Sequence, residues 1–361
     1  MAMLQKILAT SGLVLCITCT AFSQDSTNVV VVEESPKPVI SGYVDVYYRY
    51  NFANAKDASG GNFNNFTSFT NSHNSFELGM ASVRFDHTMG KVSVVADLGF
   101  GKRAEDFSYN DENTMLALKQ AYISYQVSEK LKLTAGSFAT HVGYELVDPH
   151  LNRNYSMSYM FSYGPFFHTG VKAELAAGKS GFMLGILNPN DLKTANFSQK
   201  MLGAQYSYAA SDSWKFYLNY IGGKLSEVTN LQQIDAVLLG TVSDKFSIGY
   251  NGTVQMQKAK DSLGKYDQSD SWWGSALYFN LDPSPKVGLT LRTEYFDDKK
   301  SVLGFEGSIF STTLSANFKV GALTIIPEFR LDNANTELFV KSDGAGTKST
   351  ASVLMAAVYK F

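Results

Sequence analysis

From Val39 to the end of the chain, apolar and polar residues alternate with a period of two. In the first such segment Val44 and Val46 fall in one phase, and Asp45 and Arg49 fall in the other. Successive side chains of a β-strand point to opposite faces, so this pattern predicts strands with one apolar and one polar face. The same alternation recurs in further segments, among them 92–100, 214–220, 246–257 and 323–332. The chain is therefore expected to be all-β.

The second, polar face limits where such strands can lie. In a soluble sandwich the apolar face points inward, whereas in a membrane barrel it points outward to lipid. Only 18% of the residues are charged and 13% are aromatic, which is less charge than a soluble domain normally carries. Beyond the N-terminal segment, no stretch approaches the roughly 18 to 20 apolar residues of a transmembrane helix. Strands closed into a barrel are then the way to cross a bilayer.

Short and long connections alternate along the chain. Short turns are expected at Gly90, Glu129, Lys179, Asp212, Asp244, Ser284 and Gly321. Longer polar segments lie at 53–74, 103–114, 143–166, 190–200, 223–232, 258–270, 297–307 and 333–348. Short periplasmic turns opposite long extracellular loops are typical of a transmembrane antiparallel up-and-down β-barrel, here of about 16 strands, with 14 or 18 as alternatives.

The least regular strands are expected at 75–88 and 168–177. In the first of them, Leu78 and Met80 share one phase while Val83 and Phe85 share the other. A β-bulge or a slip of register is needed to keep the apolar residues on one face.

The N-terminus predicts export. Lys6 precedes an apolar stretch at 7–21, and a small-x-small cleavage site ends at Ser23. We therefore expect a signal peptide at 1–23, a periplasmic linker at 24–38 and an outer-membrane barrel at 39–361. The expected location is the cell outer membrane.

The chain ends in SVLMAAVYKF, in which Tyr359 and Phe361 share one face. A terminal strand that ends in Phe, with an aromatic residue two positions earlier, resembles the signal by which Gram-negative cells insert barrels. The barrel-assembly machinery and outer-membrane lipid are thus expected partners. The alternative is that any β-protein can end in a strand, but the signal peptide and the alternating turns and loops favour the insertion signal.

Three segments carry a resemblance to a known family: ISGYVDVYYRYNF at 40–52, LKQAYISYQ at 118–126 and NRNYSMSYMFSYGPFFHTGVKAE at 152–174. With them, nearly all of the mature chain resembles the OmpL-like β-barrel porins of the porin-2 type. The resemblance implies an outer-membrane barrel that forms a pore, without naming a solute.

The segment from Gly143 to Pro165 is the candidate constriction, because it follows the fifth predicted strand, where general porins fold a loop into the lumen. It carries four ionisable candidates: Glu145, Asp148, His150 and Arg153. Exposed loops rarely hold as many aromatic rings as this segment does, so we expect it to pack inward. The alternative is an external loop over the barrel mouth.

Six charged residues of the predicted wall fall on inward faces: Asp45, Arg49, Arg292, Glu294, Glu328 and Arg330. They belong to predicted strands 1, 13 and 15, which become near neighbours when a barrel closes. An acidic loop facing a basic wall would create a transverse field, and charge rings set selectivity in pores. The alternative is that these residues form ion pairs that only fill space. Lys172 and Glu174 are weaker members of the set.

Enzymatic and cofactor functions have little support. Cys16 and Cys19 both lie in the predicted signal peptide, and no HExxH, P-loop or GxSxG motif occurs. The match to GxGxxA at 99–104 begins inside a strand, with no helix pattern after it. The five histidines show no metal spacing, so no metal or cofactor is expected. A formal net charge of −2 suggests no nucleic-acid partner.

Three functions remain in order. Barrels of 16 to 18 strands leave an aqueous channel, so the leading hypothesis is a porin for passive diffusion of small hydrophilic solutes or ions. The second is a non-conducting barrel that serves as an adhesin or scaffold. The third is an exported soluble β-sandwich that binds a ligand. The solute, the ion preference and assembly into a homotrimer stay open.

Overall fold

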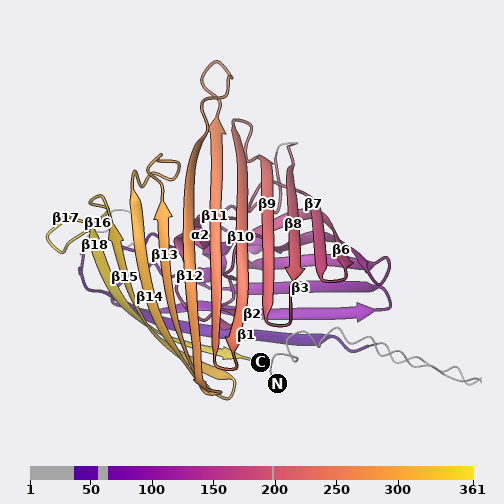
Figure 1. Ribbon diagram of the computed structural model, residues 1–361, viewed down its shortest axis with the longest axis horizontal. Coiled ribbons are helices and arrows are strands. Elements are labelled where there is room, and N and C mark those ends of the chain that lie inside the picture. The colour runs from indigo at the N-terminus through magenta and orange to yellow at the C-terminus, as the bar shows by residue number, and fades with distance from the viewer. Residues whose placement is uncertain (1–35, 56–63, 197–198) are drawn as a thin grey trace, which may run out of the picture. The chain divides into compact units, whose positions relative to one another are not determined.

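The computed structural model describes residues 36–55, 64–196 and 199–361. The predicted signal peptide and most of the predicted linker lie outside these residues. Within them, sixteen antiparallel strands close into one barrel (Figure 1). The predicted fold class and strand count are confirmed, and the soluble sandwich is excluded.

The barrel strands are β1 (Val39–Asn51), β2 (Ser75–Met89), β3 (Val92–Phe100), β4 (Leu118–Gln126), β5 (Leu131–Ala139), β6 (Phe167–Ala177), β7 (Ser180–Leu187), β8 (Met201–Ala209), β9 (Trp214–Lys224), β10 (Thr229–Ser243), β11 (Phe246–Ala259), β12 (Asp270–Ser284), β13 (Val287–Asp297), β14 (Ser308–Val320), β15 (Leu323–Ala334) and β18 (Ser349–Lys360). A separate ribbon in the last loop pairs β16 (Phe339–Val340) with β17 (Gly346–Thr347). The described helices are α1 (Lys102–Phe107), η1 (Asn113–Ala117), η2 (Pro149–Leu151) and α2 (Tyr159–Tyr163). None of these described helices is long and apolar enough to cross a membrane.

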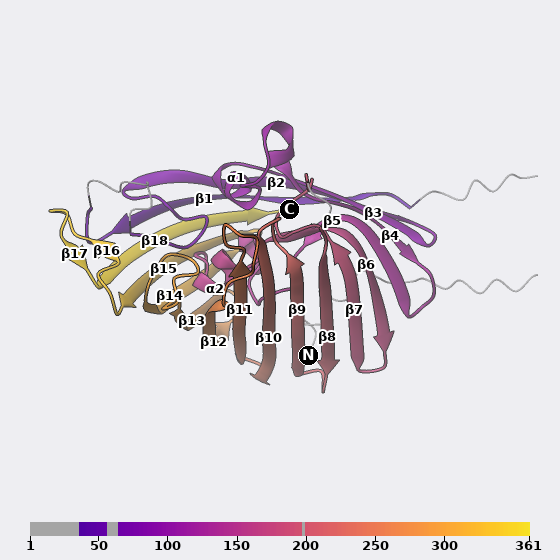
Figure 2. The ribbon, with the colours of Figure 1, turned by 90° about the horizontal axis from the view of Figure 1, so that it is seen from above.

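The first and last strands close the barrel. In β1, Tyr43 lies opposite Lys360 of β18, and the pairing continues to Asn51 (Figure 2). The backbone N–H of Phe361 donates to the carbonyl oxygen of Gly42 at 2.9 Å, and the N–H of Gly42 donates back at 3.0 Å. The predicted pairing of the C-terminal strand with the strand that carries Arg49 is confirmed.

The irregular strand at 75–88 contains the expected bulge. Val44 of β1 pairs with Ala81 of β2, whereas Val46 pairs with Leu78, so β2 has one residue more than β1 in this interval. The extra residue moves Val83 and Phe85 into the same outward phase as Leu78. The second irregular segment forms β6, also as expected.

The connections follow the predicted alternation of short turns and long loops, with two differences. The turn between β12 and β13 lies at residues 285–286, just beyond Ser284. The long loop predicted at 223–232 is wrong, because only residues 225–228 separate β9 from β10. The hydroxyl of Ser226 accepts the backbone N–H groups of Val228 and Thr229, so four residues complete the turn.

The two faces of each strand meet different surroundings. In β1, Val44 and Val46 are 41% and 47% exposed, whereas Asp45 and Arg49 are buried inside the barrel. The apolar face thus covers the outside of the barrel and the polar face lines its interior. This is the arrangement of a barrel in lipid.

Candidate functional site

Residues 140–166, which we call the lumen segment, join β5 to β6 through the inside of the barrel. The segment first crosses to the far wall. His141 Nε2 lies 2.9 Å from the carbonyl oxygen of Tyr220 in β9, and the N–H of Gly143 donates to Asp235 of β10 at 3.0 Å. The ring of Tyr144 then stacks on Tyr278 of β12 at 4.0 Å between centroids. The structure therefore places the segment inside the barrel and not over its mouth.

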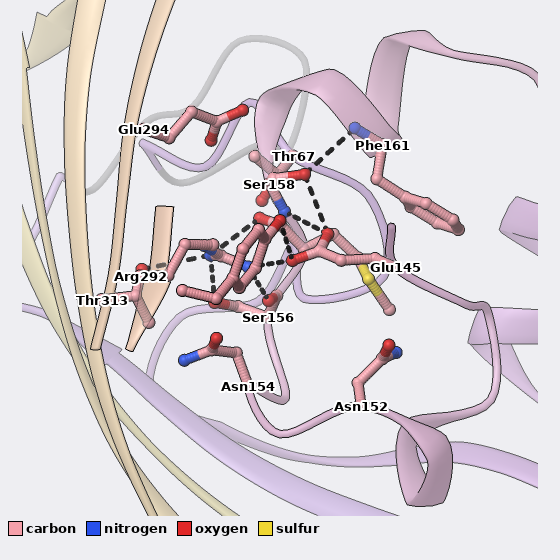
Figure 3. Close-up of polar contacts among 12 residues, drawn as sticks. Thr67, Glu145, Asn152, Asn154, Ser156, Ser158, Phe161, Arg292, Glu294 and Thr313 are labelled. Carbon is pink, nitrogen blue, oxygen red and sulfur yellow. Dashed lines mark hydrogen bonds and ion pairs between the residues drawn. The ribbon is translucent and has the colours of Figure 1, made fainter. Parts of the chain in front are cut away.

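Glu145 and Arg292 form the central contact between the lumen segment and the wall (Figure 3). Glu145 Oε1 lies 2.6 Å from Arg292 Nη1, and both side chains are buried. The second oxygen of Glu145 accepts the N–H and the hydroxyl of Ser158. Arg292 also donates to the carbonyl oxygens of Ser156 and Met157. A buried ion pair needs such additional hydrogen bonds to offset its loss of hydration.

Three wall carboxylates hold the segment by other groups. Glu294 accepts the N–H groups of Tyr159 and Met160, both at 2.9 Å, at the start of α2. Glu328 accepts the N–H groups of Tyr155 and Ser156. Asp45 accepts the hydroxyl of Tyr155 and the N–H of Met80. These carboxylates therefore satisfy loop N–H groups that have no strand partner.

The other two wall arginines also serve as anchors. Arg330 donates to the carbonyl oxygen of Met157 at 2.7 Å and pairs with Asp332 of its own strand. Its guanidinium lies 5.1 Å from the ring centre of Tyr159. Arg49 instead donates to the carbonyl oxygen of Ser72, in the loop after β1, at 2.7 Å.

The remaining candidates lie toward the short-turn end of the barrel. Asp148 lies 2.6 Å from Lys119 of β4, and His150 packs on the ring of Tyr43 with centroids 4.8 Å apart. Arg153 forms two hydrogen bonds to the carboxylate of Asp282 in β12, at 3.0 and 2.8 Å. The Arg153 and Asp282 side chains are 29% and 35% exposed, so this pair remains accessible to solvent.

Most predicted constriction residues are thus brought together, but beneath the lumen segment. Arg49, Arg292, Glu294, Glu328 and Arg330 are each at most 5% exposed. Side chains with so little free surface can shape the passage, but they cannot form much of its lining. An acidic loop residue does face a basic wall residue, at Glu145 and Arg292, as a closed ion pair.

Sequence reasoning missed two buried cations. Lys119 lies 3.1 Å from Asp97 of β3 as well as against Asp148. Arg103 of α1 is fully buried, donates to the carbonyl oxygen of Val147 and lies over the rings of Phe69 and Tyr155. The inward phase of Asp97 was a usable signal for Lys119, whereas nothing in the pattern near Arg103 points to the lumen.

An apolar cluster fills the space beside the start of the lumen segment. It consists of Phe138, Val142, Leu187, Met201, Ile221 and Leu231, from β5, the lumen segment and β7 to β10. Lys132, Lys172 and Glu174 lie on the same side of the barrel, on the inner faces of β5 and β6. Glu174 is 3.0 Å from Lys132 and 3.5 Å from Lys172, and all three side chains are partly exposed. In the described ranges, no group of three His, Cys, Asp or Glu residues could hold a metal ion.

Comparisons with known proteins agree with this architecture. The sequence model of the family described as "Putative beta-barrel porin-2, OmpL-like" matches residues 39–361. No curated protein matches the chain. Among solved structures, the outer membrane channel DcaP of Acinetobacter baumannii is 11% identical, with a TM-score of 0.62 over 90% of this chain and 97% of that one.

Two further structures are similar to the same extent. The anion-selective porin from Comamonas acidovorans is 12% identical with a TM-score of 0.60, over 90% of this chain and 99% of that chain. The trimer form of OmpT, an outer membrane protein of Vibrio cholerae, is 10% identical with a TM-score of 0.60 and the same coverage. At these identities the likeness shows the fold alone.

Proposed function

The chain belongs to the OmpL-like, porin-2 family of β-barrel porins, and from this membership we propose that the lumen segment sets the passage for small hydrophilic solutes or ions. Porins are outer-membrane channels for passive diffusion and not enzymes. The observation that carries the proposal is the crossing from β5 to the far wall, fixed there by Glu145 on Arg292. A segment held at both walls narrows the lumen at a defined height.

Charges that remain accessible are the candidates for ion preference. The Arg153–Asp282 pair and the Arg84–Asp86 pair are each neutral overall. Lys132 and Lys172 share the single carboxylate of Glu174, which leaves one positive charge on the inner wall of β5 and β6. We infer a weak preference for anions, because pore selectivity follows the charge of the lining.

Conductance tests the proposal directly. Purified protein that shows heat-modifiable gel migration, the mark of a folded barrel, is added to a planar lipid bilayer. Stable stepwise conductance is the expected result. A variant that lacks residues 147–163 should conduct more per step, because most of the lumen segment is gone. Persistent silence of the folded wild-type barrel would overturn the proposal.

A non-conducting adhesin or scaffold is the second candidate, and one observation favours it. The apolar cluster around Ile221 and Val142 closes the space between the lumen segment and the wall of β7 to β10. This candidate predicts a silent wild-type barrel and a conducting variant without residues 147–163. The two functions are therefore separated by the wild-type protein alone.

Two assembly proposals accompany the function. The terminal aromatic residues Tyr359 and Phe361, which are 51% and 58% exposed, would be recognised by the barrel-assembly machinery during insertion. A homotrimer is the proposed assembly, since the structure of OmpT is described as a trimer form. Chemical cross-linking in outer-membrane fractions should then give a band of three chains.

A further inference from the structure

A hollow of 670 Å³ opens at the long-loop end of the barrel, next to α2. We call it the external vestibule. Its lining comes from the loops after β1, β3, β5 and β7 and from the upper parts of β10 and β11. The volume lies within the range of about 300 to 1,000 Å³ that is typical of small-molecule sites.

Three aromatic rings line the vestibule: Tyr109, Tyr163 and Phe166. Tyr109 is 57% exposed and meets Phe166 edge to face, with centroids 6.1 Å apart. The hydroxyl of Tyr163 donates to the carbonyl oxygen of Phe66 at 2.7 Å, which fixes the orientation of that ring. Fixed ring faces carry partial negative charge and attract C–H groups, such as those on the faces of sugar rings.

Five amide side chains line the same space: Asn71, Asn110, Asn190, Gln255 and Gln257. Each amide offers both donors and acceptors, which is the pairing that hydroxyl groups need. The side-chain oxygen of Asn190 has no hydrogen-bond partner within the described part of the chain, although the residue is only 9% exposed. A buried polar atom without a partner points to a missing ligand or solvent group.

The charges of the lining are already engaged. Among the described residues it contains no Lys, Arg or His, and only two carboxylates, Asp106 and Asp191. Asp106 lies 2.8 Å from Lys102. Asp191 accepts the N–H groups of Phe166 and Phe167 and the hydroxyl of Tyr109. Such a lining offers no cation to bind an anion and no uncommitted carboxylate to bind a cation.

We propose that the external vestibule binds a neutral polyhydroxylated solute of the oligosaccharide class. Rings, amides and hydroxyls without a free charge match a ligand that is itself uncharged and rich in hydroxyl groups. The site names the substrate class for the pore, and to that extent it rests on the proposed function. Binding itself needs only the folded barrel.

Trp272 provides an optical probe of the site. Its indole N–H donates to Gln255 Oε1 at 3.0 Å, and the same oxygen accepts the amide of Gln257 at 2.6 Å. The other tryptophans are Trp214 and Trp273, so a variant with W214F and W273F keeps Trp272 alone. A ligand that rearranges the Gln255–Gln257 pair should change the emission of Trp272.

The experiment titrates this variant, folded in detergent, with maltohexaose, and repeats the titration with citrate and with spermidine. Equilibrium dialysis with maltohexaose provides a second measurement that does not depend on fluorescence. We expect saturable binding of maltohexaose alone. Y109A and Q257A should each weaken it at least tenfold, whereas Y266A, in the loop between β11 and β12, should leave it unchanged.

Binding of citrate or spermidine in place of maltohexaose would overturn the proposal, and so would absence of maltohexaose binding in both measurements. Conductance separates this failure from failure of the proposed function. A conducting barrel that binds no sugar refutes the vestibule alone. A silent barrel that binds maltohexaose refutes the pore alone.

Discussion

Glu145 of the lumen segment lies 2.6 Å from Arg292 of β13, and neither side chain is more than 5% exposed. The pair joins a segment that leaves the barrel wall at β5 to a strand on the opposite side. Its burial makes it sensitive to the loss of one partner, because the remaining charge cannot return to water. The contact is therefore the most direct test of what holds the lumen segment in place.

Glu145→Gln should destabilise the barrel and loosen the segment. Arg292 would stay buried without its counter-ion, which typically costs about 3 to 5 kcal/mol. We expect a lower free energy of unfolding in urea and larger, noisier conductance steps. The matched control is Asp86→Asn, at the Arg84–Asp86 pair, whose side chains are 31% and 36% exposed. Exposed pairs contribute about 0 to 1 kcal/mol, so equal effects of the two variants would contradict the prediction.

Phe361→Ala should reduce assembly without altering the pore. The terminal residue closes the barrel through two backbone hydrogen bonds to Gly42, and its ring lies against that glycine on the outer surface. Far from the lumen segment, it has no route to the passage. We expect less heat-modifiable protein in the outer-membrane fraction and normal single-channel conductance of the protein that inserts. Phe318→Ala, which removes another outward ring, serves as the control and should assemble normally.

Strand pattern and closure could be predicted because they depend on local alternation. Val44 and Asp45 have opposite phases whatever their neighbours are, and closure then places β18 beside β1. The bulge in β2 was also readable, since Leu78 and Val83 could share a face only with an extra residue. The loop at 223–232 was wrong because Ser226 shortens the turn by hydrogen bonds that its composition does not reveal.

Burial of the wall charges could not be read from the sequence. The phase of Arg292 gives its direction, but its cover is Glu145 and Ser156, more than 130 residues away. Lys119 was missed for a related reason. The register between β3 and β4 shifts next to Asp97, so alternation alone does not bring the two side chains together.

Lys172 and Glu174 should move ion preference in opposite directions. Lys172→Gln removes the excess positive charge of the Lys132–Glu174–Lys172 group, whereas Glu174→Gln adds to it. The first variant should shift the reversal potential in a salt gradient toward cations, and the second toward anions. Lys299→Gln, in the loop after β13, is the control, because its side chain is 56% exposed and lies outside the strands. Shifts of the same sign in the two test variants would disprove the assignment.

Acidity should tighten the loop after β7 through Asp191. Burial raises the pKa of this carboxyl from 3.8 to about 6, although the N–H groups of Phe167 and Phe166, the Tyr109 hydroxyl and the nearby Lys193 partly oppose the shift. The folded loop thus holds the proton more tightly than the unfolded chain. Stability is gained as the pH falls from about 6 to about 4, by at most about 3 kcal/mol. At neutral pH the ionised carboxylate weakens the loop.

Hydrogen exchange of the peptide around Phe166 and Phe167 measures this effect, after correction for the intrinsic pH dependence of exchange. Wild-type protection should be greater at pH 5 than at pH 7.5. Asp191→Asn keeps an oxygen that accepts the same N–H groups but does not ionise, so its protection should be equal at both values. Asp261→Asn, in the loop between β11 and β12, should retain the wild-type difference. Equal protection of the wild-type peptide at the two pH values would show that Asp191 does not titrate in this range.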